Sequence, residues 1–464
     1  MKRLFRRIVA VLLALIGLAI FVYCWLFFPV LTGWVAKSSC SAVFVSHRDP
    51  ATLKGQDYWR FMFRHIDFHV NYADSSVTAS IAGLARRTAV YRQGLGATLL
   101  SGTTAHELRQ QPITLAAPPR LSQDMIPWPQ GDLHADTILP DVDTAKLRLG
   151  VDAAFYDTTY HDSTGTRALI VLYKGRIVAE RYAAGFNAQM PLLGWSMTKS
   201  ITNALLGVLV RQGRLDIHAP VPVAAWQNDD RRKITYVNLM QMTSGLRFHW
   251  VPIAPGDLTN MLFKEKDMAT FVEGLPLKHP PGTVFHYSDG NAILLSKLIR
   301  DKLGDSVYYR FPYEQLFDKI GMWHTTLEPD AGGTFVGCSY CYATARDWAR
   351  FGLLYLRDGV WNGERLLPEG WVRWSGTASG IHNMESREGE YGALWWVNAT
   401  GRPDSPGWRF MPDVPADCFS AMGLDGQNIF VIPSKDLVVV RLGMDRGHEQ
   451  HPNILLYHLL KAFP

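Results

Sequence analysis

The feature that constrains this chain most is an uncharged apolar stretch at residues 8–31. Only Gly17, Tyr23, Cys24 and Pro29 interrupt its aliphatic, phenylalanine and tryptophan side chains. These 24 residues are enough to cross the hydrocarbon core of a bilayer. Inside a bilayer, a single segment can satisfy its backbone hydrogen bonds only as a helix. The sequence therefore predicts a transmembrane helix over residues 8–31.

The residues on either side of this stretch predict its orientation. Basic side chains precede it and aromatic residues gather near its far end, which favours a cytoplasmic amino terminus. We expect residues 1–7 to form a basic cytoplasmic stub. The chain would then be a single-pass protein of the cytoplasmic membrane, with its main domain facing the periplasm or the outside. A cleaved signal peptide is the alternative. The run is longer than a signal core, and no good small-x-small cleavage site follows, which favours an uncleaved anchor.

The charge of the rest of the chain argues against nucleic-acid binding. The formal net charge is +5, but four of the 47 basic residues lie before residue 8. The remaining 43 basic residues face 42 acidic ones, so the body is nearly neutral. With 47% hydrophobic and 19% charged residues, a chain of 464 residues can form a large core. We expect an amino-terminal extension and a proline-rich connector over residues 32–144, and one main domain over residues 145–464.

The main domain shows hairpins at both ends and helices between them. Short apolar segments on either side of a turn predict one hairpin at 168–173 and 176–182, and a second at 427–433 and 437–442. Helical segments are expected from Ser196 to Gly213 and at residues 234–243, 289–303, 344–358 and 453–462. Two weaker strand segments, 77–85 and 87–92, lie in the extension. This order predicts an α+β fold: an antiparallel sheet assembled from both ends and flanked by helices, plus a helical subdomain.

A Ser-x-x-Lys motif, Ser196 to Lys199, stands at the start of the first of these helices. Residues three apart on a helix project from one face, so the two side chains should meet. A serine hydroxyl needs a neighbouring base or cation to act as a nucleophile. A partly desolvated lysine, with a lowered pKa, can serve. The motif by itself is weak, since a helix can carry an incidental serine and a solvated lysine. Its position on an apolar helix favours a serine hydrolase.

Two further segments could complete such a site. Tyr287 lies in a turn before the helix at 289–303, where a phenolate made accessible by a lysine ammonium could act as general base. The segment 421–428 places glycines beside a strand, where a substrate can approach backbone N–H groups. A core tyrosine and an ordinary tight turn are the alternatives for these segments.

In combination these motifs resemble the class C β-lactamase-related serine hydrolases. The resemblance covers about residues 150–460 and is greatest to the 6-aminohexanoate-dimer hydrolases and the β-lactamase-like esterases. It implies the β-lactamase/transpeptidase-like fold, an α/β/α sandwich. The motifs occur in this order: Ser196-x-x-Lys199, Met242-Thr-Ser-Gly-Leu246, Pro281-Gly-x-x-Phe-x-Tyr287-Ser288, Ala343-Thr-Ala-Arg-Asp347 and Gly423-x-x-Gly426-Gln427.

The resemblance also implies residue roles. Ser196 would be the acylated nucleophile, Lys199 its partner and Tyr287 the residue that carries a proton to the leaving group. The backbone N–H groups of Ser196 and Leu424 would form the oxyanion hole. Substrate-binding positions would be Asp289, Asn291, Gly423 and Asp425.

Two departures from the family pattern bear on the substrate. The usual asparagine two residues after the tyrosine is Asp289, with Asn291 further on. The Lys-Thr-Gly triad is absent, and Ala421 stands where its lysine would bind a substrate carboxylate. Losing such a charge-assisted contact costs roughly 1.5–3 kcal/mol. This argues against efficient β-lactamase or DD-peptidase activity and favours neutral esters or amides.

The expected function is therefore a membrane-anchored serine hydrolase that cleaves a small ester or amide without metal or organic cofactor. A β-lactamase or DD-peptidase, and a non-catalytic penicillin-fold binding module, are the alternatives. The oligomeric state cannot be predicted. Four cysteines, Cys40, Cys338, Cys341 and Cys418, would face an oxidising compartment, and the sequence does not choose among their three possible pairings.

Overall fold

The computed structural model describes residues 2–116, 122–134, 139–157, 162–251, 255–385, 389–400, 404–445 and 451–464. The chain divides into two compact units. Unit 1 comprises Met1–Gln110, His249–Met268 and Asp330–Gly332, and unit 2 comprises Gln111–Phe248, Ala269–Pro329 and Gly333–Pro464. The boundaries predicted at residues 32 and 145 stay predictions.

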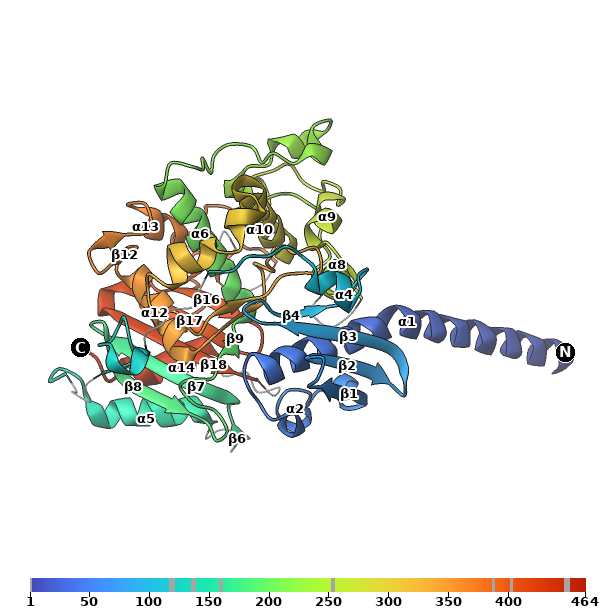
Figure 1. Ribbon diagram of the computed structural model, residues 1–464, viewed down its shortest axis with the longest axis horizontal. Helices are drawn as coiled ribbons and strands as arrows, with labels where there is room; N and C mark the ends of the chain where they lie inside the picture. Colours follow the sequence, from blue (N-terminus) through green and yellow to red (C-terminus); the bar gives the residue numbers. More distant parts are fainter. Residues whose placement is uncertain are drawn as a thin grey trace. The chain divides into compact units, whose positions relative to one another are not determined.

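Unit 1 is built on one long helix, α1 (Lys2–Phe44), which includes the predicted span and continues beyond it. Among the described residues, α1 is the one helix long and apolar enough to cross a membrane. From Phe27 onward most of its side chains are buried. This second half packs on an antiparallel sheet of strand order β1-β2-β3-β4 (Figure 1). The strands are Ile66–Asn71, Ser76–Ile81, Leu84–Arg92 and Gly96–Leu99. The smaller helices of this unit are α2 (Pro50–Gln56), α3 (Phe61–Arg64), α4 (Ala105–Arg109) and α8 (Asp257–Lys264).

Unit 2 is organised around a seven-stranded sheet of order β14-β15-β16-β17-β18-β7-β8, antiparallel throughout (Figure 1). Both predicted hairpins are confirmed: β7 (Thr166–Tyr173) pairs with β8 (Arg176–Tyr182), and β17 (Gln427–Ile432) with β18 (Leu437–Gly443). Strand β18 also pairs with β7, which joins the two ends of the domain in one sheet. The remaining strands of the sheet are β14 (Glu390–Tyr391), β15 (Trp396–Val397) and β16 (Phe419–Gly423).

Helices cover both faces of this sheet, as in an α/β/α sandwich. On one face, α5 (Thr144–Phe155) and α14 (Pro452–Leu460) share a core with alternate residues of β7, β17 and β18. On the other face, α12 (Ala345–Leu356) lies against β17, β18 and β7. Gly352 allows this close approach, since a Cβ there would lie 2.5 Å from a Val438 methyl carbon. Because both faces are covered, every residue of β7 is buried.

The helical part of unit 2 contains the Ser196–Lys199 motif. Its main helices are α6 (Thr198–Arg211), α7 (Tyr236–Met240), α10 (Asp289–Leu303) and α11 (Asp305–Tyr308). Helix α9 spans Met268–Glu273 and α13 spans Trp371–Ser375. Helix α7 is shorter than the predicted 234–243. Thr235 caps its start, and Met242 adopts a left-handed φ of 58° beyond its end. The minor strands are β5 (Tyr156–Asp157), β6 (Asp162–Ser163), β9 (Leu192–Leu193), β10 (Thr326–Leu327), β11 (Cys341–Ala343), β12 (Val360–Trp361) and β13 (Glu364–Arg365).

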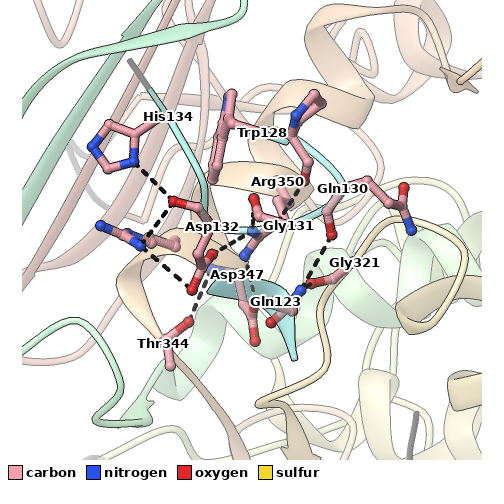
Figure 2. A network of polar contacts seen from close by, with 12 residues as sticks. Gln123, Trp128, Gln130, Gly131, Asp132, His134, Gly321, Thr344, Asp347 and Arg350 are labelled. Carbon is pink, nitrogen blue, oxygen red and sulfur yellow. Dashed lines mark hydrogen bonds and ion pairs between the residues drawn. The ribbon is translucent and has the colours of Figure 1, made fainter. Parts of the chain in front are cut away.

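Residues 122–134 of the proline-rich connector are bound to α12 by a buried arginine. Arg350 has no exposed surface and donates to the carbonyl oxygens of Pro129 and Gly131, at 2.7 Å each. It also pairs with the carboxylates of Asp132 and Asp347, and its Cζ lies 4.7 Å from the centroid of the Trp128 ring (Figure 2). Asp347 closes the Ala343–Asp347 motif noted in the sequence. These contacts fix residues 129–132 of the connector to α12.

Candidate active site

The predicted nucleophile lies in a tight turn that leads directly into α6. Ser196 is the middle residue of a 3₁₀ turn, Trp195–Met197, and α6 starts at Thr198. Trp195 adopts a left-handed φ of 46°, which is strained for a large side chain. The turn is held from behind, since the Gly194 N–H donates to the Cys341 carbonyl at 2.9 Å. Ser196 is half-buried, as a nucleophile that must meet a substrate requires.

Lys199 joins the serine to a carboxylate. Its Nζ lies 2.8 Å from Ser196 Oγ, 2.7 Å from Asp289 Oδ1 and 3.0 Å from the Cys338 carbonyl oxygen. An ammonium has three N–H donors, and these three acceptors match them. The Lys199 and Asp289 side chains are only 1% and 4% exposed, so water screens this ion pair little. The structure thus presents a charged donor to the serine oxygen.

Asp289 acquires its role through the fold of the following helix. It is the first residue of α10, where the helix dipole favours a negative side chain. At the position where the family usually has asparagine, this chain places a full negative charge opposite Lys199. Substrate contact was predicted for Asp289, and that contact stays a prediction.

Tyr287 faces the same ammonium. Its ring centroid lies 5.0 Å from Lys199 Nζ. The ring stacks on Trp396 at 5.5 Å between centroids and meets Tyr391 edge-on at 6.0 Å. Burial raises the pKa of Tyr391 far above its ordinary value, so this neighbour stays uncharged. The aromatic contacts fix the ring of Tyr287 beside the serine–lysine pair.

The end of strand β16 lies against the nucleophile turn, as the oxyanion-hole prediction requires. A Cβ on Gly423 would lie 2.3 Å from the Gly194 carbonyl oxygen and 3.1 Å from the Ser196 nitrogen. Only glycine therefore fits here. Leu424 is the next residue, at the start of the turn to β17. The role of its N–H beside that of Ser196 stays a prediction.

Two other predicted substrate-binding residues make contacts within the protein. Asn291 is fully buried; its Oδ1 accepts from Ser244 Oγ at 2.9 Å, and its amide donates to the Met242 sulfur. It thereby holds the loop after α7. Asp425 is 5% exposed, has a left-handed φ of 60° and forms the turn between β16 and β17. Contact of either residue with substrate stays a prediction.

The structure adds residues that sequence reasoning missed. The Tyr287 N–H donates to Glu385 Oε2 at 3.2 Å, and the other oxygen of Glu385 pairs with His286 Nδ1. His286 Nε2 lies 2.5 Å from the Phe248 carbonyl oxygen. Both ring nitrogens face acceptors, and the pKa of His286 is raised, chiefly by Glu385. Adjacency to Tyr287 could have drawn attention to His286, but nothing in the sequence signals Glu385.

The cysteine segment next to the site is structural. Burial, and then the charge of Asp289, raise the pKa of the Cys338 thiol, so it stays protonated. The Cys341 N–H donates to Thr198 Oγ1 at 3.1 Å. All five cysteines lie in the described residues, and none forms a disulfide. None of the three pairings that the sequence left open is therefore formed in this structure.

The layered antiparallel sheet, the Ser-x-x-Lys pair and the facing tyrosine define a serine hydrolase of β-lactamase fold. The profile of the family described as Beta-lactamase matches residues 159–458, well over half of the chain. The chain therefore belongs to the β-lactamase family. This confirms the resemblance drawn from its motifs.

Comparison with individual proteins agrees with this assignment. The chain is 27% identical over 302 residues to a 6-aminohexanoate-dimer hydrolase of Paenarthrobacter ureafaciens, covering 61% of this chain and 73% of that one. A Bacillus anthracis protein provisionally described as a 6-aminohexanoate-dimer hydrolase superposes with a TM-score of 0.54 at 24% identity, covering 65% and 81%. The hydrolase EstCE1, described as having promiscuous acyltransferase activity, gives a TM-score of 0.53 at 13% identity, covering 68% and 97%. At these identities the structures support the fold alone.

Proposed function

We propose that this protein is a membrane-anchored serine hydrolase that cleaves a small neutral ester or amide through an acyl-enzyme at Ser196. The observation that carries the proposal is the position of Lys199 Nζ, within hydrogen-bond distance of both Ser196 Oγ and Asp289 Oδ1. Burying an ammonium is costly, and the ion pair with Asp289 offsets part of that cost. The ammonium is thereby held at the serine oxygen, where it can act on the reaction. It can stabilise the negative charge that develops on that oxygen.

The reaction would proceed in two balanced halves. Ser196 Oγ attacks the substrate carbonyl carbon as its proton passes to the Tyr287 side chain, which starts as a phenolate, and the negative oxygen formed on the carbonyl is held by backbone N–H groups. The intermediate collapses as the leaving alcohol or amine takes that proton, which leaves an ester on Ser196. Water then attacks this ester with Tyr287 again accepting a proton. The acid is released and the proton returns to Ser196.

The residue at position 421 of strand β16 bears on the class of substrate. Ala421 lies in β16, two residues before Gly423, and its side chain is 2% exposed. A methyl group there cannot pair with a substrate carboxylate as a lysine would. We therefore favour an uncharged group on the acyl side over a β-lactam or peptidoglycan carboxylate. The relationship to a 6-aminohexanoate-dimer hydrolase supports an amide or ester substrate without identifying it.

Active-site labelling tests the proposed chemistry. The full chain in detergent should react with a fluorophosphonate probe and hydrolyse p-nitrophenyl butyrate, and Ser196→Ala should lose both activities. Ser200→Ala is the matched control: Ser200 lies on the same helix, and its hydroxyl donates to the Leu394 carbonyl at 2.7 Å. Undiminished turnover in Ser196→Ala would refute the mechanism. Nitrocefin turnover comparable to ester turnover would favour the β-lactamase alternative.

Membrane anchoring is a separate part of the proposal and has its own test. A reporter enzyme that becomes active only outside the cytoplasm, fused after residue 150, should be active and remain with the membrane fraction. An inactive fusion would refute the orientation. A fusion released in soluble form would favour a cleaved signal peptide.

A further inference from the structure

Helix α1 first contacts the four-stranded sheet of unit 1 at the end of that sheet that carries the β2–β3 turn. Helix α1 is exposed up to residue 26 and becomes buried from Phe27. Five residues later, Thr32 Oγ1 donates to the Ala85 carbonyl at 2.6 Å, beside the β2–β3 turn. Trp34 packs on Phe63, with 5.4 Å between ring centroids. The β2–β3 turn and α3 therefore lie where the apolar span ends.

The opposite end of the sheet is marked by different contacts. Phe44, the last residue of α1, packs on Tyr72 at 5.9 Å and on Tyr91 at 5.5 Å. Tyr72 follows β1, at the end of the sheet away from the β2–β3 turn. Twelve residues of helix separate Thr32 from Phe44, a rise of about 18 Å. The unit thus has a near end and a far end with respect to the span.

The near end carries exposed apolar side chains among arginines. Phe61 is 78% exposed and Leu84 is 67% exposed. Arg60, Arg64 and Arg86 stand beside them in the sequence. Segments 58–65 and 81–88 contain no acidic residue. Exposed large apolar side chains next to basic residues are typical of a surface that meets a lipid interface.

The arginines are held so that they support this surface. The Arg64 guanidinium donates through Nε to the Trp59 carbonyl at 2.8 Å. The Arg60 guanidinium lies 4.9 Å from the centre of the Trp59 ring. Arg86 donates through Nε to the Gly83 carbonyl at 3.3 Å, within the β2–β3 turn. Each of the three arginines thus contacts the segment that also carries Phe61 or Leu84.

We propose that this near end, defined as residues 59–65 and 82–86, lies on a bilayer surface rich in anionic phospholipid. Phe61 and Leu84 would enter the headgroup–acyl boundary, and the three arginines would bind lipid phosphates. The inference rests on the proposed membrane anchoring of α1. Because α1 runs from the span into unit 1 as one helix, no flexible linker separates the near end from the headgroups.

Spin labels on the full chain test this inference. Labels would be placed at Phe61→Cys and Leu84→Cys, with Tyr72→Cys as the matched control, in a Cys24→Ala background. Tyr72 is also an exposed aromatic residue, at 64%, but lies at the far end. The proteins would be reconstituted in nanodiscs of phosphatidylcholine alone or with 30% phosphatidylglycerol. Collision with oxygen should exceed collision with a water-soluble nickel complex at positions 61 and 84 but not at 72. Ester turnover checks that each labelled protein is folded.

The outcomes separate the inference from the anchoring on which it rests. A label at Leu15→Cys, within the span, should be fully lipid-exposed, and water exposure there would refute anchoring itself. If position 15 is in lipid while positions 61 and 84 resemble position 72, the inference is overturned. Adding phosphatidylglycerol should move the labels at positions 61 and 84 deeper into the bilayer. A variant that combines R60Q, R64Q and R86Q should show no such change in depth. Equal depth in both bilayers would overturn the anionic-lipid preference.

Discussion

Removing the charge of Asp289 tests how the Lys199 ammonium is stabilised. The Asp289→Asn substitution keeps the shape and one acceptor oxygen but removes the negative charge 2.7 Å from Lys199 Nζ. At an effective dielectric constant of about 20, two unit charges at this separation attract by about 6 kcal/mol. Part of that attraction only offsets the cost of removing both charges from water. We expect the free energy of unfolding to fall by about 3–5 kcal/mol, as when one partner of a buried pair is removed.

A double-mutant cycle measures this interaction independently of catalysis. Lys199→Met alone leaves a buried carboxylate without its partner and should also destabilise the protein strongly. The double variant has neither charge. Its loss should therefore be smaller than the sum of the two single losses by at least about 1 kcal/mol.

The assay is urea unfolding followed by tryptophan fluorescence at pH 7, with the midpoint and the slope both reported. Asp230→Asn is the control, since the Asp230–Lys233 pair is exposed and its loss should leave the midpoint unchanged. Additive losses in the cycle would show that Lys199 and Asp289 do not stabilise each other. The interpretation of the site as a held ammonium would then fail.

Three further substitutions probe the site and its support. His286 has a raised pKa because of Glu385, so its imidazolium should be fully formed below about pH 6.5 and should lose its proton as pH rises through the raised value. We expect kcat/KM to fall with that loss, and Glu385→Gln should shift the fall to lower pH; an unchanged profile would contradict this. Gly423→Ala should lower ester turnover about 10²-fold by displacing the nucleophile turn. Gly55→Ala, which meets nothing within 4 Å, should retain it. Arg350→Met should cost about 3–5 kcal/mol of stability by removing the guanidinium from two buried carboxylates, and a wild-type urea midpoint would refute that role.

Local pattern predicted much of the architecture. The apolar segments around Gly175 and Asp436 predicted both hairpins of the main sheet, because their apolar residues must be buried and their turns need left-handed backbone. The helix at Asp289–Leu303 was also predicted at its observed bounds. The length of α7 was wrong, since its end is set by the Met242 backbone, which tertiary packing decides.

Pairing in the site could not be predicted in the same way. Residue spacing placed Lys199 beside Ser196, because one helical turn fixes that distance. The ion pair with Asp289 joins residues 90 positions apart, and that of Glu385 with His286 joins residues 99 apart. Contacts of this range depend on how α10 and the loop before β14 pack in the finished domain. No local pattern encodes them.

The sequence by itself determined the apolar stretch, the antiparallel hairpins and the placing of Lys199 beside Ser196, since each follows from a pattern or a spacing along the chain. Only the tertiary structure decided what the departures from the family pattern do. Asp289 became the counter-ion of Lys199, and Asn291 became a support for the loop after α7. The physical reason is burial: a charge or an amide withdrawn from water must find a partner inside the protein, and the fold decides which partner is within reach.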